Sequence, residues 1–588
     1  MKRFAQRTGA VLRRRCGAAG RFASELAGWV VEAGGPSARV GPRAAALLAL
    51  SVAGCDLDPG RVDDIVGAAD VRPRRVETAG GPVLGAAAAD GQAFLGIPYA
   101  APPVGPLRWR APQPVRPWTE PLQATRLGPS CIQNLALSAQ LGGGGGPTLG
   151  QEDCLTLNVY APADAAARPG KPVMVWLHGG AFVLGTSGQY DPSALARRED
   201  ALVVTVNYRL GALGFLAHPS LRGEPGEGAF ALLDQRAALR WVQNNIAAFG
   251  GDPRRVTLFG QSAGAWSACY HMASPGSAGL FSRAILQSGA CVIPETSLPA
   301  GAAEAGGARM AADLGCGGAD ALACLRALPA DAVVEAAPER AGVTGPNSWS
   351  PATGLDVLPL PPRDAFARGR FAPVPTIDGT DRDEGRLFAY LRGLGFDLVT
   401  DAGYEAEIRR LYGARAGAVL AAYPADRFPS PRAAYAAVLT DGYFACPALD
   451  LDRLIERAAP VFAYEFDDPD PPFALPRLPF SGGAGSYHTS EIAYVFDRPW
   501  LLADPVHFDA AQARLSAALQ DYWGSFARDG RPRGDAAWPR MGARGGVLRL
   551  SPDGVAPARD FAERHRCAFW QSPAGRGGAA LPEPVQTE

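Results

Sequence analysis

The sequence predicts an α/β fold with a large, mostly parallel central sheet, helices on both faces and long insertions. Three observations favour this fold class. Short apolar runs typical of buried strands alternate with segments of helical periodicity. A G-x-S-x-G motif falls between one such strand and a helix. The chain has 588 residues, 47% of them hydrophobic, which is enough to bury a large core.

The predicted elements follow one another along the chain without an internal repeat or a second composition regime. We expect buried strands at 172–177, 201–206, 256–259, 284–286, 373–377 and 461–466, and helices over 230–247 and from Ala263 onward. Strands that alternate with helices indicate a parallel sheet covered on both faces. We therefore expect one large domain over residues 76–573, followed by a disordered tail over 574–588.

The first 55 residues differ from the rest of the chain in charge. Up to Arg43, nine Lys or Arg and two Glu give a charge of about +7. The whole chain has a net charge of −1, so the residues after Arg43 carry about −8. An apolar run and small residues up to Cys55 then have the order of a signal peptide, and Val52-Ala53-Gly54-Cys55 resembles the lipobox of bacterial lipoproteins. We expect an N-terminal extension and signal segment over 1–55, lipidation of Cys55 and a polar tether over 56–75. The protein would then lie outside the cytoplasm, secreted or lipid-anchored at the cell envelope; an Ala-rich stretch without a targeting role is the alternative.

Charge and cysteine spacing exclude several classes of protein. An acidic body without a basic stripe argues against nucleic-acid binding. No apolar run reaches the roughly 18 residues of a transmembrane helix. The ten cysteines contain no C-x-x-C pair, and the chain has no H-E-x-x-H stretch, so no metal is expected. Many cysteines in an exported chain indicate disulfides.

Ser262 is the candidate nucleophile. It stands at the centre of Gly260-Gln261-Ser262-Ala263-Gly264, directly after a predicted strand and before a predicted helix. The nucleophile of such a motif lies on a strained turn, where larger side chains two positions away would clash. Chance alone produces about 0.4 such motifs in a chain of this composition, so the strand-turn-helix context carries the prediction.

The segment His178-Gly179-Gly180-Ala181-Phe182 is the candidate oxyanion loop, because it directly follows the strand that ends at Leu177. Acyl transfer needs N–H donors aimed at the developing oxyanion, and small residues let the backbone approach the substrate. We expect the donors to be the N–H groups of Gly180, Ala181 and Ala263.

The order Ser, acid, His along the chain selects the remaining candidates. The histidines far enough beyond Ser262 are His488, His507 and His565. Two arginines flank His565, an unfavourable setting for a base that must gain a positive charge, and no glycine exposes His507. His488 follows a glycine-rich loop at 481–486 and is favoured. The acid would follow the predicted strand 373–377, where four carboxylates compete: Asp378, Asp381, Asp383 and Glu384.

Several longer motifs resemble type-B carboxylesterases, the family that includes cholinesterases and many bacterial esterases. They run in order from about Val76 to Trp570, at 96–100, 102–105, 152–160, 207–211, 233–235, 250–253 and 383–385. The resemblance implies the α/β-hydrolase fold, a bacterial serine carboxylesterase without cofactor, Glu384 as the acid and His488 as the base. Ser262 would attack the ester carbonyl and form an acyl-enzyme that water hydrolyses.

The resemblance also implies roles for other residues. It pairs Cys131 with Cys154, Cys316 with Cys324 and Cys446 with Cys567; Cys269 and Cys291 either form a fourth bridge or stay reduced. It implies structural ion pairs between Arg108 and Glu152 and between Arg209 and Asp234. Ser288 and Glu491 match positions beside the triad in relatives, or are alternatively ordinary buried polar residues. Gln261, the residue before the nucleophile, would also lie beside the triad.

Two departures from the family limit the expected substrate. Gln261 stands where relatives commonly carry Glu, and the segment between Cys131 and Cys154 contains no Trp on which a quaternary ammonium could stack. We therefore expect a neutral, hydrophobic small-molecule ester. The alternatives are a lipase for long-chain esters, which a lid would distinguish, and a non-catalytic binding ectodomain, which would require a broken triad.

Overall fold

A computed structural model describes residues 71–134, 148–293, 296–336, 349–393, 400–473, 483–503, 505–542 and 546–576. Cys55 and the predicted N-terminal extension lie outside the described residues, as do most of the predicted tether and tail. None of the helices within these ranges has the length and hydrophobicity that a membrane span requires.

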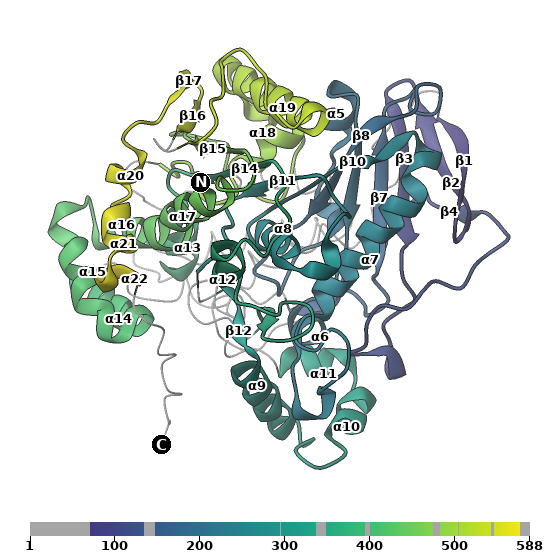
Figure 1. The fold of residues 1–588 in the computed structure, drawn as a ribbon, viewed down its shortest axis with the longest axis horizontal. Helices are drawn as coiled ribbons and strands as arrows, with labels where there is room; N and C mark the ends of the chain where they lie inside the picture. Colours follow the sequence, from purple (N-terminus) through teal and green to yellow (C-terminus); the bar gives the residue numbers. More distant parts are fainter. Residues whose placement is uncertain are drawn as a thin grey trace, which may run out of the picture.

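A 13-stranded sheet runs through the molecule (Figure 1). Its central strands pair in parallel and its two ends pair antiparallel. In spatial order the path is β1 (Arg72–Thr78), β2 (Gly81–Ala88), β3 (Gly91–Pro98), β7 (Thr156–Ala161), β9 (Leu202–Val206), β8 (Lys171–Leu177), β10 (Gly251–Gln261), β11 (Arg283–Gln287), β14 (Thr376–Asp381), β15 (Val461–Phe466), β16 (Val547–Ser551) and β17 (Gly554–Pro557), with β4 (Leu122–Gln123) paired to β2.

Helices cover both faces of the sheet, because its central strands are apolar on both sides. In β8, Val173, Val175 and Leu177 point into one core and Met174 and Trp176 into the other. The first core is closed by α7 (Phe230–Asn245), α8 (Ala263–Ala273) and α17 (Cys446–Ile455), and the second by α5 (Ser193–Arg198), α18 (Ile492–Phe496) and α19 (Ala510–Asp529). The fold is the predicted α/β class with a mixed central sheet.

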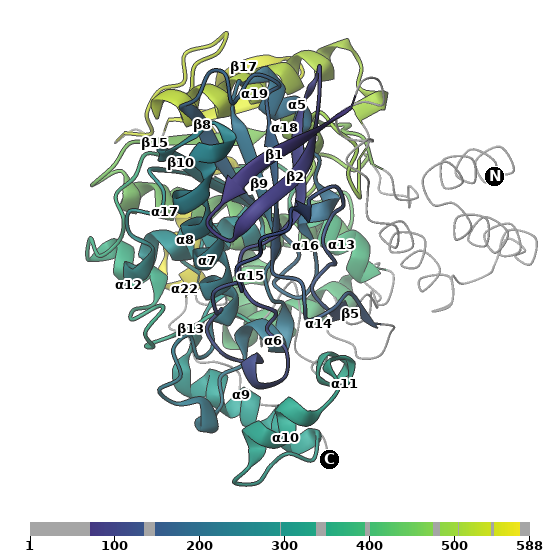
Figure 2. The ribbon, with the colours of Figure 1, turned by 90° about the vertical axis from the view of Figure 1, so that its right-hand side faces the viewer.

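The remaining helices include some at the periphery and others whose side chains belong to the first core. Figure 2 shows α9 to α11 together at the end of the molecule below the sheet. These helices are α9 (Ala300–Asp313), α10 (Ala321–Ala327) and α11 (Ala330–Glu335). The others are α6 (Gly211–Phe215), α12 (Pro362–Ala367), α13 (Gly385–Gly393), α14 (Asp401–Tyr412), α15 (Ala416–Ala422), α16 (Pro431–Leu439), the π-helix η9 (Thr440–Ala445), α20 (Phe561–Arg564), α21 (Cys567–Gln571) and α22 (Pro573–Arg576).

One predicted strand is placed too early in the sequence. The structure puts β14 at Thr376–Asp381, not at 373–377, so Asp378 and Asp381 lie inside a fully buried strand instead of leaving its end. Carboxyl groups tolerate this position because burial raises their pKa and each pairs with another carboxyl group. The sheet also begins at Arg72, within the predicted tether, and α22 ends at Arg576, within the predicted tail.

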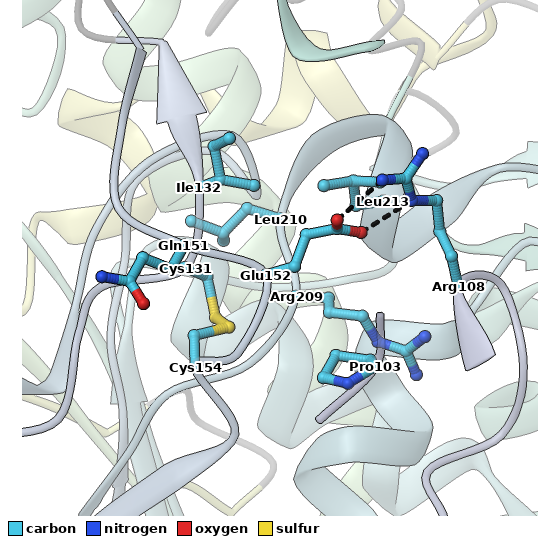
Figure 3. Close-up of a pocket in the computed structure, with 10 residues that line it drawn as sticks. All are labelled: Pro103, Arg108, Cys131, Ile132, Gln151, Glu152, Cys154, Arg209, Leu210 and Leu213. Atoms are coloured by element: carbon cyan, nitrogen blue, oxygen red, sulfur yellow. Dashed lines mark hydrogen bonds and ion pairs between the residues drawn. A yellow bond between two sulfur atoms is a disulfide. The ribbon is translucent and has the colours of Figure 1, made fainter. Parts of the chain in front are cut away.

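Four disulfides tie the described chain together. The three bridges implied by the family resemblance are present, and Cys269 is bonded to Cys291, which settles the pair left open by the sequence. Figure 3 shows the Cys131–Cys154 bridge beside the Arg108–Glu152 ion pair, whose closest atoms are 2.7 Å apart. The other expected ion pair, Arg209–Asp234, is buried and also 2.7 Å long.

Candidate active site

Ser262 lies at the sharp turn that joins β10 to α8. Its φ and ψ are +56° and −123°, a sparsely populated conformation for a residue with a side chain. The backbone is held there from both directions, since the Ser262 N–H donates to the carbonyl of Gln287 at 2.8 Å and its carbonyl accepts from Trp266 at 2.9 Å. The sheet and the helix thus fix a strained serine at the carboxyl end of a central strand.

The glycines of the motif are required by close packing. A Cβ on Gly260 would lie 2.5 Å from the backbone of Gly264, and a Cβ on Gly264 would lie 1.9 Å from the carbonyl oxygen of Leu177. Neither contact is tolerable for a real Cβ. The helix therefore starts pressed against the end of β8, which brings Ser262 beside the segment that follows Leu177.

The loop from His178 to Phe182 lies directly against Ser262. A Cβ on Gly179 would be 3.1 Å from the Cβ of Ser262, so only a glycine lets the two segments approach. Three successive residues have positive φ: Gly180 at 114°, Ala181 at 53° and Phe182 at 64°. This turn directs backbone N–H groups differently from a strand or helix, as an oxyanion-binding loop requires. The N–H of Ala263, in the first turn of α8, is the third expected donor.

His178 itself is a structural residue of this loop. Its ring stacks on Tyr208 at 4.3 Å, and Nδ1 lies 2.9 Å from the carbonyl of Gly179. Burial lowers the pKa of His178 to about 4, so the ring is neutral at physiological pH. The histidine therefore braces the turn and adds no charge beside Ser262.

His488 and Glu384 form a buried pair. Nδ1 of His488 lies 2.5 Å from Oε2 of Glu384, and the second oxygen of Glu384 accepts the backbone N–H of Asp381 at 2.9 Å. Of the four carboxylates that compete in the sequence, only Glu384 makes this contact. Nε2 of His488 lies 3.3 Å from the side-chain amide of Gln261, the residue before Ser262. The second imidazole nitrogen therefore points at the turn that carries the serine.

The other two expected neighbours of the triad are also placed by the structure. Glu491 is fully buried, and its Oε1 accepts from Gln287 at 3.1 Å, directly behind the turn of Ser262. Ser288 has φ +57°, its N–H donates to the carbonyl of Gly379 at 2.8 Å, and its hydroxyl has no partner within the described chain. Glu491 lies in the loop of His488, and Ser288 directly follows β11, whose last residue, Gln287, accepts the N–H of Ser262.

Two phenylalanines beside His488 were not anticipated from the sequence. The rings of Phe388 and Phe444 each lie 4.9 Å from the imidazole, on α13 and on the π-helix η9. Phe388 stands four residues after Glu384, a helical spacing that could have indicated a shared face. Nothing in the sequence places Phe444 there.

His507 and His565 lie in unlike surroundings, and neither belongs to the candidate site. His507 is exposed. The sequence-based reason for rejecting His565 was wrong, because carboxylates and not arginines meet its ring: Nδ1 lies 2.6 Å from Asp441 and Nε2 lies 2.8 Å from Glu465. Burial disfavours the charged ring, but these two partners outweigh burial and raise the pKa of His565 to about 9.

The pocket in Figure 3 is separate from these residues. It is a cavity of about 10 Å³ beside the Cys131–Cys154 bridge, enough for about one water molecule. Within the described ranges, no group of three or more His, Cys, Asp or Glu side chains has an arrangement that could hold a metal ion.

Comparisons with known proteins agree with this geometry. A model of the carboxylesterase family matches residues 72–570. The chain is 36% identical to a cocaine esterase of Oryctolagus cuniculus, over 81% of this chain and 90% of that protein, and 36% identical to a fumonisin B1 esterase of Sphingopyxis macrogoltabida, over 80% and 86%. A solved PNB esterase superposes with a TM-score of 0.70 at 31% identity, over 85% of this chain and 100% of that one. The chain therefore belongs to the carboxylesterase family and is a carboxylic ester hydrolase.

Proposed function

We propose that the protein hydrolyses neutral, hydrophobic carboxylic esters by a Ser262–His488–Glu384 triad through an acyl-enzyme. The observation that carries this proposal is the 2.5 Å contact between His488 and Glu384, combined with a strained Ser262 beside the glycine loop. A base held by a carboxylate at one nitrogen leaves the other nitrogen for the serine proton.

In the proposed reaction His488 accepts the proton of Ser262 as the hydroxyl oxygen attacks the ester carbonyl. Glu384 holds the imidazole in the correct tautomer and stabilises its positive charge. The N–H groups of Gly180, Ala181 and Ala263 stabilise the oxyanion, and each such donor contributes about 10²–10³ in rate. His488 then protonates the leaving alcohol, and water attacks the acyl-enzyme by the same route.

The preference for neutral, hydrophobic esters rests on the groups around His488. Two phenylalanine rings flank it, and the neutral Gln261 lies beside it. No tryptophan is present between Cys131 and Cys154 to stack on a quaternary ammonium. Relatives are named for cocaine, acylcarnitine and fumonisin B1, so family membership alone does not choose the substrate.

Hydrolysis of p-nitrophenyl esters from acetate to palmitate tests the proposal. Ser262→Ala should lower kcat by about 10⁴-fold or more. Ser267→Ala, which removes a buried hydroxyl from the same helix, is the matched control and should keep its activity. A Ser262→Ala variant as active as the control would refute the triad, and a preference for palmitate would favour a lipase.

We also propose that the protein is exported and that Cys55 is its acylated N-terminus. The four disulfides support an oxidising compartment. Mass spectrometry of the mature protein from the membrane fraction tests this directly. An N-terminus other than acylated Cys55 would reject the lipid anchor and leave the enzyme mechanism untouched.

A further inference from the structure

A buried pair of carboxyl groups, Asp381 and Glu491, lies next to the Glu384–His488 pair. Asp381, at the end of β14, and Glu491, just before α18, are both fully buried, and their carboxyl groups lie within hydrogen-bonding reach of each other. The proposed mechanism gives neither residue a chemical step. Two buried carboxyl groups in contact, next to a third in Glu384, need a physical explanation.

The available donors account for only half of the four oxygens. Oδ2 of Asp381 accepts the backbone N–H of Ser490 at 3.2 Å, and Oε1 of Glu491 accepts from the amide of Gln287 at 3.1 Å. Oδ1 of Asp381 and Oε2 of Glu491 have no donor among the described residues. Two buried carboxyl groups within hydrogen-bonding reach of each other require a proton between them, because two bare carboxylates would repel each other.

Of the groups that face the pair, the negative charge of Glu384 makes full ionisation still less favourable, whereas a positive charge on His488 would favour it. The facing groups are Glu384 on the loop after β14, Tyr487 and His488 on the loop before α18, Tyr464 on β15 and Tyr190 on the loop before α5. Burial first, and then the negative charges of Glu491 and Glu384, raise the pKa of Asp381 well above its ordinary value. Of the facing groups only His488 can become a cation.

The pair also connects the loops that carry the triad. The backbone N–H of Asp381 holds Glu384, its side chain holds Ser490 in the loop of His488, and Glu491 holds Gln287, whose carbonyl accepts the N–H of Ser262. A change in the contact between Asp381 and Glu491 would therefore reach all three triad residues. A displacement of about 1 Å at a catalytic group can cost about 10²-fold in rate.

We propose that Asp381 and Glu491 share a single proton, and that this proton-bridged pair positions Glu384 and the His488 loop for catalysis. The inference rests on the proposed triad mechanism. Asp381 and Glu491 are positioning residues, since they act through Glu384, the His488 loop and Gln287. Loss of the shared proton at alkaline pH places a second negative charge in the pair. The two carboxylates then repel each other and move apart, and the rate of ester hydrolysis falls; this loss of activity is called the alkaline fall below.

The test compares kcat/KM against pH for wild type, Asp381→Asn, Asp381→Ala and Glu491→Gln, with p-nitrophenyl acetate as substrate. An amide donates a hydrogen bond without a titrating proton. Asp381→Asn and Glu491→Gln should therefore keep kcat within about threefold at pH 7 and lose the alkaline fall, because the bridge can no longer ionise. Asp381→Ala, which removes the bridge, should lower kcat by about 10-fold or more with little change in KM.

Asp378→Asn is the matched control, because Asp378 is another buried carboxyl on β14 that pairs with Asp452. It should leave the alkaline fall in place. An Asp381→Asn variant that keeps the wild-type alkaline fall overturns the shared proton. So does an equal loss of activity in the folded Asn and Ala variants, or an Asp378→Asn variant that also removes the fall.

Stability against pH supplies a readout that does not depend on the triad mechanism. A carboxyl whose pKa is raised in the folded state stabilises the fold fully at low pH, and that stabilisation is lost as pH rises through the folded pKa. Between the unfolded and the folded pKa of the pair, unfolding of wild type should release about one more proton than unfolding of Asp381→Asn. The unfolding constant from urea denaturation should therefore rise with pH by up to tenfold more per pH unit in wild type than in the variant. Equal proton release in both proteins would refute the shared proton even if the triad proposal also failed.

Discussion

Two buried histidines of this chain, each only 3% exposed, are placed in contrasting ways. His488 contacts one carboxylate, Glu384, and its other nitrogen faces the turn of Ser262. His565 contacts a carboxylate at each nitrogen, Asp441 and Glu465. One carboxylate orients an imidazole and leaves its other nitrogen free of an acidic partner, whereas two carboxylates keep the His565 ring a cation up to about pH 9, its raised pKa. These two histidines therefore differ in the number of their acidic partners and not in burial.

The surroundings of His565 explain why this chain keeps a charged ring in its interior. Arg564 also contacts Glu465, at 2.8 Å, and Tyr423 donates to the second oxygen of Asp441 at 2.7 Å. These contacts join η9, β15 and the C-terminal helices near the Cys446–Cys567 bridge. Since Phe444 on η9 packs on His488, the structural histidine supports one wall of the candidate site.

The largest expected effect separates the two histidines by activity. His488→Ala should lower kcat by about 10⁴-fold or more, because the proposed base is lost, and should change the melting temperature little. His565→Ala should keep most of its turnover per folded molecule, measured with p-nitrophenyl acetate after active-site titration. Comparable losses of turnover in both variants would break the distinction.

The second prediction separates the two histidines by stability. His565→Ala leaves Asp441 and Glu465 buried without their shared cation, which should cost about 3–5 kcal/mol of unfolding free energy. The pKa of His565 is raised from 6.5 to about 9 in the folded state. Its contribution is therefore complete below about pH 6.5 and is lost as pH rises through about 9. Urea unfolding at pH 6 and pH 10 should give a large difference from wild type at pH 6 and a small one at pH 10; equal differences would contradict the assignment.

The smallest expected effect concerns the residue that follows each histidine. Thr489 has φ +82° and Arg566 has φ +49°, both in the region that favours glycine. The strain is greater for the β-branched Thr489, whose hydroxyl has no partner among the described residues. Thr489→Gly should therefore raise stability by about 1 kcal/mol, measured by urea unfolding.

Arg566→Gly is the matched variant at the other histidine. The guanidinium of Arg566 lies 4.5 Å from the ring centre of Tyr423, a contact worth about 0.5–2 kcal/mol that the glycine would lose. We expect this variant to be no more stable than wild type. A destabilised Thr489→Gly variant would mean that the threonine side chain, and not the backbone, holds the loop of His488.

Much of this enzyme could be predicted from local sequence. The apolar runs of β8 and β10 predict buried strands because burial of apolar side chains stabilises the fold. The glycines of residues 260–264 predict the turn because a larger side chain would clash with the neighbouring backbone. The family resemblance supplied Glu384, His488 and the cysteine pairs. Local chemistry alone did not distinguish among four acids, since carboxylates in one short segment have the same chemistry. Only the fold determines which of them contacts the histidine.

The tertiary structure decided what depends on long-range contacts. The partners of His565 lie 124 and 100 residues away in the chain, so its sequence neighbours, two arginines, suggested the opposite charge environment. Phe444 reaches His488 only through the packing of η9, and the proximity of Asp381 to Glu491 depends on β14 meeting the loop before α18. Local spacing determines which residues can form a turn or a strand, but the pKa and the role of a buried group are set by whatever the fold packs against it.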